Sequence, residues 1–148
     1  MSTTRESLDR LSYNQLFGFL FGAVYVVVGV VGFAITSGLG FAAHPGKELI
    51  IFSVNPLHNV VHIAVGGLLI LGAALGFGVS RAVNGLVGAV YFLVGVLGLF
   101  VINSSANILA INHPDNGLHL ATALLALVVA LSEQRAGALS GGPNLARR

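Results

Sequence analysis

Four long runs of apolar residues, separated by short polar or glycine-rich stretches, dominate the pattern of this chain. A helix of about 20 residues is about 30 Å long, which is the thickness of the hydrocarbon core of a bilayer. Each run is close to this length and almost free of charge, so the pattern predicts four membrane-spanning α-helices. The expected spans are residues 16–35, 56–79, 83–102 and 112–131.

Two polar motifs stand at the starts of the second and fourth runs. Residues 55–63 read Asn-Pro-Leu-His-Asn-Val-Val-His-Ile, and residues 112–120 read Asn-His-Pro-Asp-Asn-Gly-Leu-His-Leu. Asn55 suits the N-cap of a helix, and Pro56 suits the first helical turn, where no amide hydrogen is needed. The last histidine of each motif lies about 10 Å into its helix. Polar side chains at that depth should face protein or water, so both motifs are candidate functional sites.

The first and third runs share a pattern of their own. Residues 22–25 and 88–91 both read Gly-Ala-Val-Tyr, and the agreement continues over the following turns. Together with the two polar motifs, this predicts two copies of one helix pair. Two copies that each cross the membrane twice have the same orientation, as in a parallel repeat about an axis along the membrane normal. The first run is then a retained span, not a cleaved signal peptide, and Tyr25 and Tyr91 are expected to pack between helices.

The composition supports a membrane protein and excludes several other classes. Hydrophobic residues make up 55% and charged residues 8% of the chain, and the mean hydropathy is +0.91. Soluble domains carry about 25% charged residues. There is no cysteine, so disulfides and thiol chemistry are excluded. No basic cluster supports nucleic-acid binding. We expect an all-α, multi-pass protein of the plasma (inner) membrane.

The positive charges are distributed unevenly between the two ends of the predicted spans. Cytoplasmic segments of membrane proteins carry an excess of Lys and Arg. All the arginines fall on one side: Arg5, Arg10, Arg81, Arg135, Arg147 and Arg148. Only Lys47 falls on the other side. The distribution predicts cytoplasmic termini, with a lead-in at 1–15 and a flexible tail at 133–148, and places both polar motifs at the extracytoplasmic end.

The two polar motifs carry a resemblance to a known family. The chain resembles, over about residues 10–132, an uncharacterised family of small four-span bacterial membrane proteins, domain of unknown function 4383. The second motif is the more specific of the two. The resemblance implies four helices and a membrane location, and it implies no activity.

The spacing of the polar side chains suggests a metal site. Residues three and four positions apart lie on one face of a helix. His58 and His62 are paired in this way on the second span, and Asp115 and His119 on the fourth. Facing pairs would present three imidazoles and one carboxylate, a set that suits Zn²⁺, Fe²⁺ or Cu²⁺. Around them we expect a polar cluster of Asn55, Asn59, Asn112 and Asn116.

Other interpretations of the motifs remain open. They could be purely structural, with interhelical hydrogen bonds joining the two halves of an accessory subunit in a homo-oligomer or a larger membrane complex. A haem between His62 and His119 is a further alternative. An enzyme has less support because no nucleophile stands beside the histidines, and a channel would need oligomerisation. The leading functional hypothesis is a bilayer-embedded binding or accessory module whose polar cluster of His, Asn and Asp binds a metal ion or another small ligand.

Overall fold

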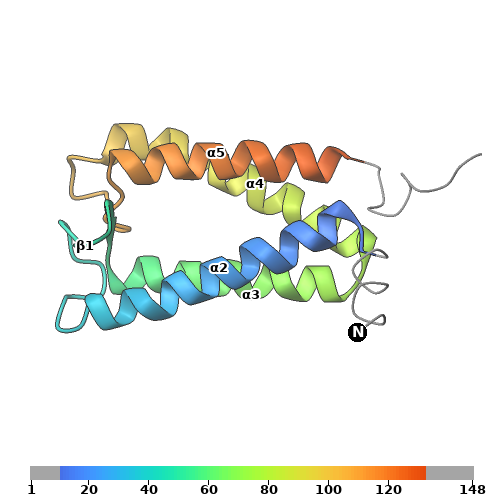
Figure 1. Ribbon diagram of the computed structural model, residues 1–148. Helices are drawn as coiled ribbons and strands as arrows, with labels where there is room; N and C mark the ends of the chain where they lie inside the picture. The colour runs from blue at the N-terminus through green and yellow to red at the C-terminus, as the bar shows by residue number, and fades with distance from the viewer. Residues whose placement is uncertain (1–10, 133–148) are drawn as a thin grey trace, which may run out of the picture.

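The computed structural model describes residues 11–132, and within them the chain is a bundle of four helices capped at one end by a short β-hairpin (Figure 1). All four helices are long and apolar enough to cross a membrane, which confirms a multi-pass helical architecture. The elements are α2 (Tyr13–Ile35), β1 (Lys47–Leu49), β2 (Phe52–Val54), α3 (Pro56–Ala74), α4 (Phe77–Val101) and α5 (His113–Leu131).

Side-chain caps set the starts of three helices. Ser12 and Gln15 form a capping box at the start of α2, which therefore begins three residues before the predicted span. Asn55 caps α3 as expected, since its side chain accepts a hydrogen bond of 2.9 Å from the amide of His58. Asn112 caps α5 and forms a capping box with Asp115.

The turn between α3 and α4 comes earlier than the sequence pattern suggested. α3 ends at Ala74, whereas the predicted span continued to residue 79. Gly76 has a φ of 110°, a conformation that glycine adopts readily, and it is the N-cap of α4. The apolar residues that follow it belong to α4, because continuous apolar sequence hides a turn from a pattern based on hydropathy alone.

The helices pack as two close pairs, α2 with α3 and α4 with α5 (Figure 1). Glycines permit the close approach: a Cβ added to Gly22 would lie 2.7 Å from the carbonyl oxygen of Gly66, and one added to Gly66 would lie 2.6 Å from that of Gly22. Gly88 lies similarly close to Ala123 and Leu127 in the other pair. Close backbone packing of this kind is a common way for helices to associate in lipid.

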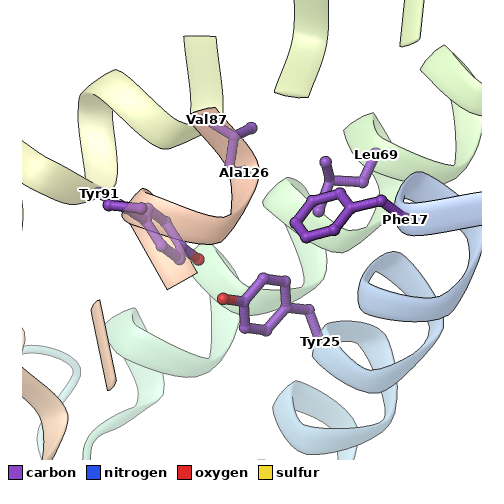
Figure 2. Close-up of a cluster of buried hydrophobic side chains, with 7 residues drawn as sticks. Phe17, Tyr25, Leu69, Val87, Tyr91 and Ala126 are labelled. Carbon is purple, nitrogen blue, oxygen red and sulfur yellow. The ribbon is translucent and has the colours of Figure 1, made fainter. Parts of the chain in front are cut away.

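The core lies along the seam between the two pairs. It consists of Phe17, Tyr25, Leu69, Val87, Tyr91, Ala123 and Ala126 (Figure 2). The small alanine side chains let α5 approach the tyrosine rings. Large apolar side chains elsewhere on the helices are exposed, as on a surface that faces lipid.

The long connection between α2 and α3 folds over the end of the bundle. β1 and β2 pair antiparallel, with Leu49 opposite Phe52. The side chain of Asn112 donates to the carbonyl of Ile51 at 2.9 Å, which ties the hairpin to the start of α5. The segment thus folds over the helix ends. Of the expected terminal segments, 1–10 and 133–148 lie outside the described residues.

Candidate functional site

Three of the four proposed metal ligands meet at one point inside the bundle. One ligand atom from each of His58, His62 and His119 lies within 4.8 Å of the other two. His58 and His62 come from successive turns of α3, and His119 comes from α5 in the other helix pair. All three side chains are buried, with relative exposures of 1%, 8% and 7%. We call these residues the histidine trio.

Two tyrosines complete a closed ring of aromatic side chains together with the trio. Tyr25 from α2 meets His62 edge-on at 5.2 Å between ring centroids, and Tyr91 from α4 meets His119 at 5.1 Å. The tyrosines meet each other at 5.7 Å, with their hydroxyl groups directed toward one another (Figure 2). Every helix contributes to this ring. The expectation that the tyrosines pack between helices is therefore confirmed.

The trio is notable for ring nitrogens that have no hydrogen-bond partner within the described part of the chain. Both ring nitrogens of His58 are buried and unpartnered, as are Nδ1 of His62 and Nδ1 of His119. A buried polar group that lacks a partner costs about 1–3 kcal/mol, so native proteins keep few of them. Unpartnered ring nitrogens on three imidazoles that lie this close together are an arrangement that a bound cation would satisfy.

The fourth proposed ligand, Asp115, is not part of the histidine trio and has hydrogen-bond partners of its own. Its Oδ2 accepts hydrogen bonds from the backbone amides of Ser53 at 3.2 Å and Asn112 at 3.3 Å. The carboxylate thus joins the start of α5 to strand β2, and its negative charge suits the positive N-terminal end of a helix. The structure brings together three of the predicted ligands and gives Asp115 a different set of partners.

The asparagines of the first motif make structural contacts. Asn55 donates to the carbonyls of Ala43 at 3.0 Å and Ile108 at 2.8 Å, so it holds the two loops together. Asn59 donates to the hydroxyl of Thr36 at 2.9 Å, at the C-terminal end of α2. Neither of these two asparagine side chains forms a hydrogen bond with the trio.

The asparagines of the second motif differ from each other. Asn112 caps α5 and binds the hairpin, as described above. Asn116 is buried beside Gly98, as Asn59 is beside Gly32, but its amide has no partner within residues 11–132. The reason is a difference at the helix ends: the C-cap of α2 is Thr36, whereas the C-cap of α4 is Ile102, which has no hydroxyl group.

With this geometry established, comparison with known proteins supplies one finding. The family described as Domain of unknown function (DUF4383) matches residues 15–132, which is most of the chain. The chain belongs to the DUF4383 family. No curated protein and no solved structure matches it. The description of this family names no activity, so the chemistry of this DUF4383 protein has to be argued from the site itself.

A second buried polar cluster, at the opposite end of this DUF4383 protein, was not predicted. Asn14 donates to the carbonyl of Val129 at 2.9 Å and accepts from the side chain of Asn84 at 2.9 Å. Both asparagines are fully buried. They join α2, α4 and α5. Asn84 could have been noticed in the sequence because it is a polar residue within an apolar run. Asn14 gave no such signal, because it stands at the edge of the first run.

The remaining two histidines lie away from the trio. His44 in the first loop and His113 at the start of α5 are both exposed. His113 is useful as a control because it stands on the same helix as His119.

Proposed function

We propose that this protein is a metal-binding module of the plasma membrane, which holds one divalent transition-metal ion with His58, His62 and His119. The observation that carries the proposal is the close approach of three buried imidazoles, each of which has at least one ring nitrogen without a hydrogen-bond partner in the described chain. Three histidines with an open fourth position form a well-known zinc ligand set. Imidazole also suits Cu²⁺ and Fe²⁺.

The spacing of the trio fits a small ion. Zinc–nitrogen bonds of about 2.0–2.1 Å in a tetrahedral site place the nitrogens about 3.4 Å apart. The present separations, up to 4.8 Å, need side-chain adjustments of about an ångström to close around the ion. A haem fits less well, because the rings of the trio and the tyrosines are in mutual contact, with centroid separations from 4.6 to 6.1 Å. A porphyrin would have to displace them.

Asp115 contributes charge in this proposal, without being a ligand. It stands one turn before His119 on α5, so the Cβ atoms of the two residues are about 6 Å apart. A divalent ion among three neutral imidazoles carries an uncompensated charge, which is costly in a membrane. A nearby carboxylate reduces that cost, and its bonds to Ser53 and Asn112 hold it in place.

The proposal includes the topology that the sequence suggested. The four helices are two copies of one helix pair in a parallel repeat, with both termini in the cytoplasm and the trio near the extracytoplasmic end. The matching contacts of Gly32 with Asn59 and of Gly98 with Asn116 support the repeat. The first copy contributes two histidines to the ion and the second contributes one, so the site forms only when the halves meet.

A structural subunit is the alternative role, and the asparagines favour it in part. Asn55, Asn59 and Asn112 serve helix ends and loops through hydrogen bonds. The motifs therefore combine two roles: the asparagines stabilise the fold, and the histidines bind the ion. A homo-oligomer or a larger membrane complex is compatible with both roles, because the helices expose apolar side chains around the bundle.

Metal analysis of the full chain tests the proposal. The protein is purified in detergent, stripped with a chelator, reloaded with Zn²⁺, desalted and measured by elemental analysis. We expect about one zinc per chain, a large loss in His62→Ala and His119→Ala, and no loss in the control His113→Ala. Equal zinc content in His119→Ala and His113→Ala would contradict the proposal and leave the structural role.

A further inference from the structure

A cavity of about 340 Å³ opens sideways between the two helix pairs. Its long wall is one stripe of α2, which includes Phe21, Val24, Val28 and Val31. Val24 and Val31 also contribute to the outer surface, with relative exposures of 56% and 45%. The cavity therefore faces the lipid around the protein. We call it the lateral cavity.

The other walls come from α5 and the hairpin. Leu118 and Thr122 lie across from α2, and Leu49, Ile50 and Phe52 close the end at the hairpin. His62 and Tyr25 form part of the inner wall, so the lateral cavity adjoins the ring of aromatic side chains that contains the histidine trio. Its size falls within the range of about 300–1,000 Å³ that is usual for small-molecule sites.

The chemistry of the walls determines what fills the lateral cavity. The walls are almost wholly apolar, and water enters a cavity only when polar partners are available. If a cavity of this size were empty, the side chains that line it would lose van der Waals contacts. The surrounding solvent is hydrocarbon, so the filling is a hydrocarbon chain that enters from the bilayer.

The length of the cavity matches one leaflet. From Phe21 to Val31 the stripe on α2 spans ten residues, or about 15 Å. This is half of the roughly 30 Å hydrocarbon core. One end of the stripe is near the middle of the helix, and the other approaches the hairpin. The occupant therefore belongs to the leaflet on the hairpin side, with its polar end near the hairpin.

A single positive charge stands at that polar end. Lys47 on β1 is exposed, and its ammonium group donates to the carbonyl of Ser37, just beyond the end of α2, at 3.0 Å. Lys47 and Leu49 lie on the same face of the strand, whereas Glu48 lies on the other, because successive side chains alternate. Leu49 lines the cavity. An anionic headgroup above the cavity would thus meet Lys47.

We propose that the lateral cavity binds one acyl chain of an anionic phospholipid from the leaflet on the hairpin side, with the phosphate held by Lys47. The lipid chain lies along His62 and Tyr25 in the inner wall and seals the lipid side of the histidine trio. The proposal does not depend on a bound metal, because the cavity, its apolar walls and Lys47 are features of the protein alone.

Native mass spectrometry of the full chain tests this proposal. The protein, purified in detergent, is mixed with phosphatidylglycerol or phosphatidylcholine carrying the same acyl chains, and the lipid-bound fraction is measured. We expect one phosphatidylglycerol to be retained per chain, in preference to phosphatidylcholine. Val24→Trp fills the cavity and should reduce retention roughly tenfold, since excluding two methylene groups has an effect of that order.

Val30→Trp is the matched control. Val30 is on the same helix and has almost the same exposure as Val24, 57% against 56%, but it does not line the cavity. It should retain lipid as the parent does. Leu118→Trp, which fills the cavity from α5, should reproduce the effect of Val24→Trp and guards against a local folding defect. Lys47→Gln should remove the preference for phosphatidylglycerol and leave phosphatidylcholine binding unchanged.

Three results would overturn the proposal: equal retention by Val24→Trp and Val30→Trp, equal binding of the two lipids by the parent, or an unchanged preference in Lys47→Gln. Each variant is also loaded with zinc, and thermal unfolding checks its fold. Normal zinc content in Val24→Trp shows that the lipid result is independent of the proposed metal site, so the two proposals fail separately.

Discussion

The rings of His58 on α3 and His119 on α5 stack across the boundary between the two helix pairs, with centroids 6.1 Å apart and planes inclined by 27°. An ion bound by both rings connects the two pairs directly. Packing between the pairs is less extensive than packing within them. A metal ion bound at this boundary would therefore stabilise the less extensive association, the one between the two pairs.

The first prediction concerns metal and stability. Zinc at about 100 times its dissociation constant should raise the free energy of unfolding by about 2.7 kcal/mol, since it binds the folded state alone. Thermal unfolding in detergent, with and without zinc, measures the effect. His119→Ala should abolish the increase, and His113→Ala should retain it. An increase of the same size in His119→Ala would show that zinc acts elsewhere.

A second prediction uses the difference between Asn59 and Asn116. Ile102→Thr places a hydroxyl group where Thr36 has one, and so offers the unpartnered amide of Asn116 a hydrogen bond. We expect the free energy of unfolding to rise by about 1 kcal/mol. Thr36→Val removes the partner of Asn59 and should lower it by about 1–3 kcal/mol. Chemical denaturation in detergent measures both, and a loss of stability in Ile102→Thr would count against this explanation.

A third prediction tests the close approach of α2 and α3. Gly66→Ala places a methyl group against the carbonyl of Gly22 and the side chain of Val26, with gaps of 2.6 and 2.9 Å. Overpacking of this kind costs about 1–3 kcal/mol. Gly67→Ala is the control, because a Cβ there meets nothing within 4 Å. Equal unfolding free energies for the two variants would contradict the packing described for this helix pair.

The fourth prediction concerns the polar cluster at the other end of the bundle. Asn14 and Asn84 form a direct hydrogen bond, so a double-mutant cycle with alanine at both positions should show coupling. In membranes such couplings average about 0.6 kcal/mol and reach about 1.7. We expect a value in this range from the denaturation of the four proteins. Strictly additive effects would show that this hydrogen bond makes no net contribution to the free energy of unfolding.

The sequence was sufficient for the architecture because a bilayer dictates the length and polarity of each helix. The caps Asn55 and Asn112 also follow from local rules. The first turn of α4 was missed, since a glycine inside a continuous apolar run leaves no change in hydropathy. The pairing of Asn14 with Asn84 depends on which helices cross, and periodicity within one helix carries no information about that.

The candidate site was predicted only in part, because periodicity within one helix does not show which elements lie opposite it. His58 and His62 share a helix face by their spacing alone, and His119 joined them through the similarity of the two motifs. Asp115 was grouped with them on spacing, but the first loop folds back as a hairpin and offers the amide of Ser53 to its carboxylate. The fold of a loop of this length is set by tertiary contacts, which no local pattern of residues reveals.

X-ray absorption spectroscopy of the zinc-loaded full chain tests the central claim most directly. The account predicts a first shell of nitrogen and oxygen at about 2.0–2.1 Å in fourfold coordination, with outer-shell scattering from three imidazoles that falls to two in His119→Ala. A spectrum of hydrated zinc without imidazole scattering, or one identical in the parent and His119→Ala, would contradict it.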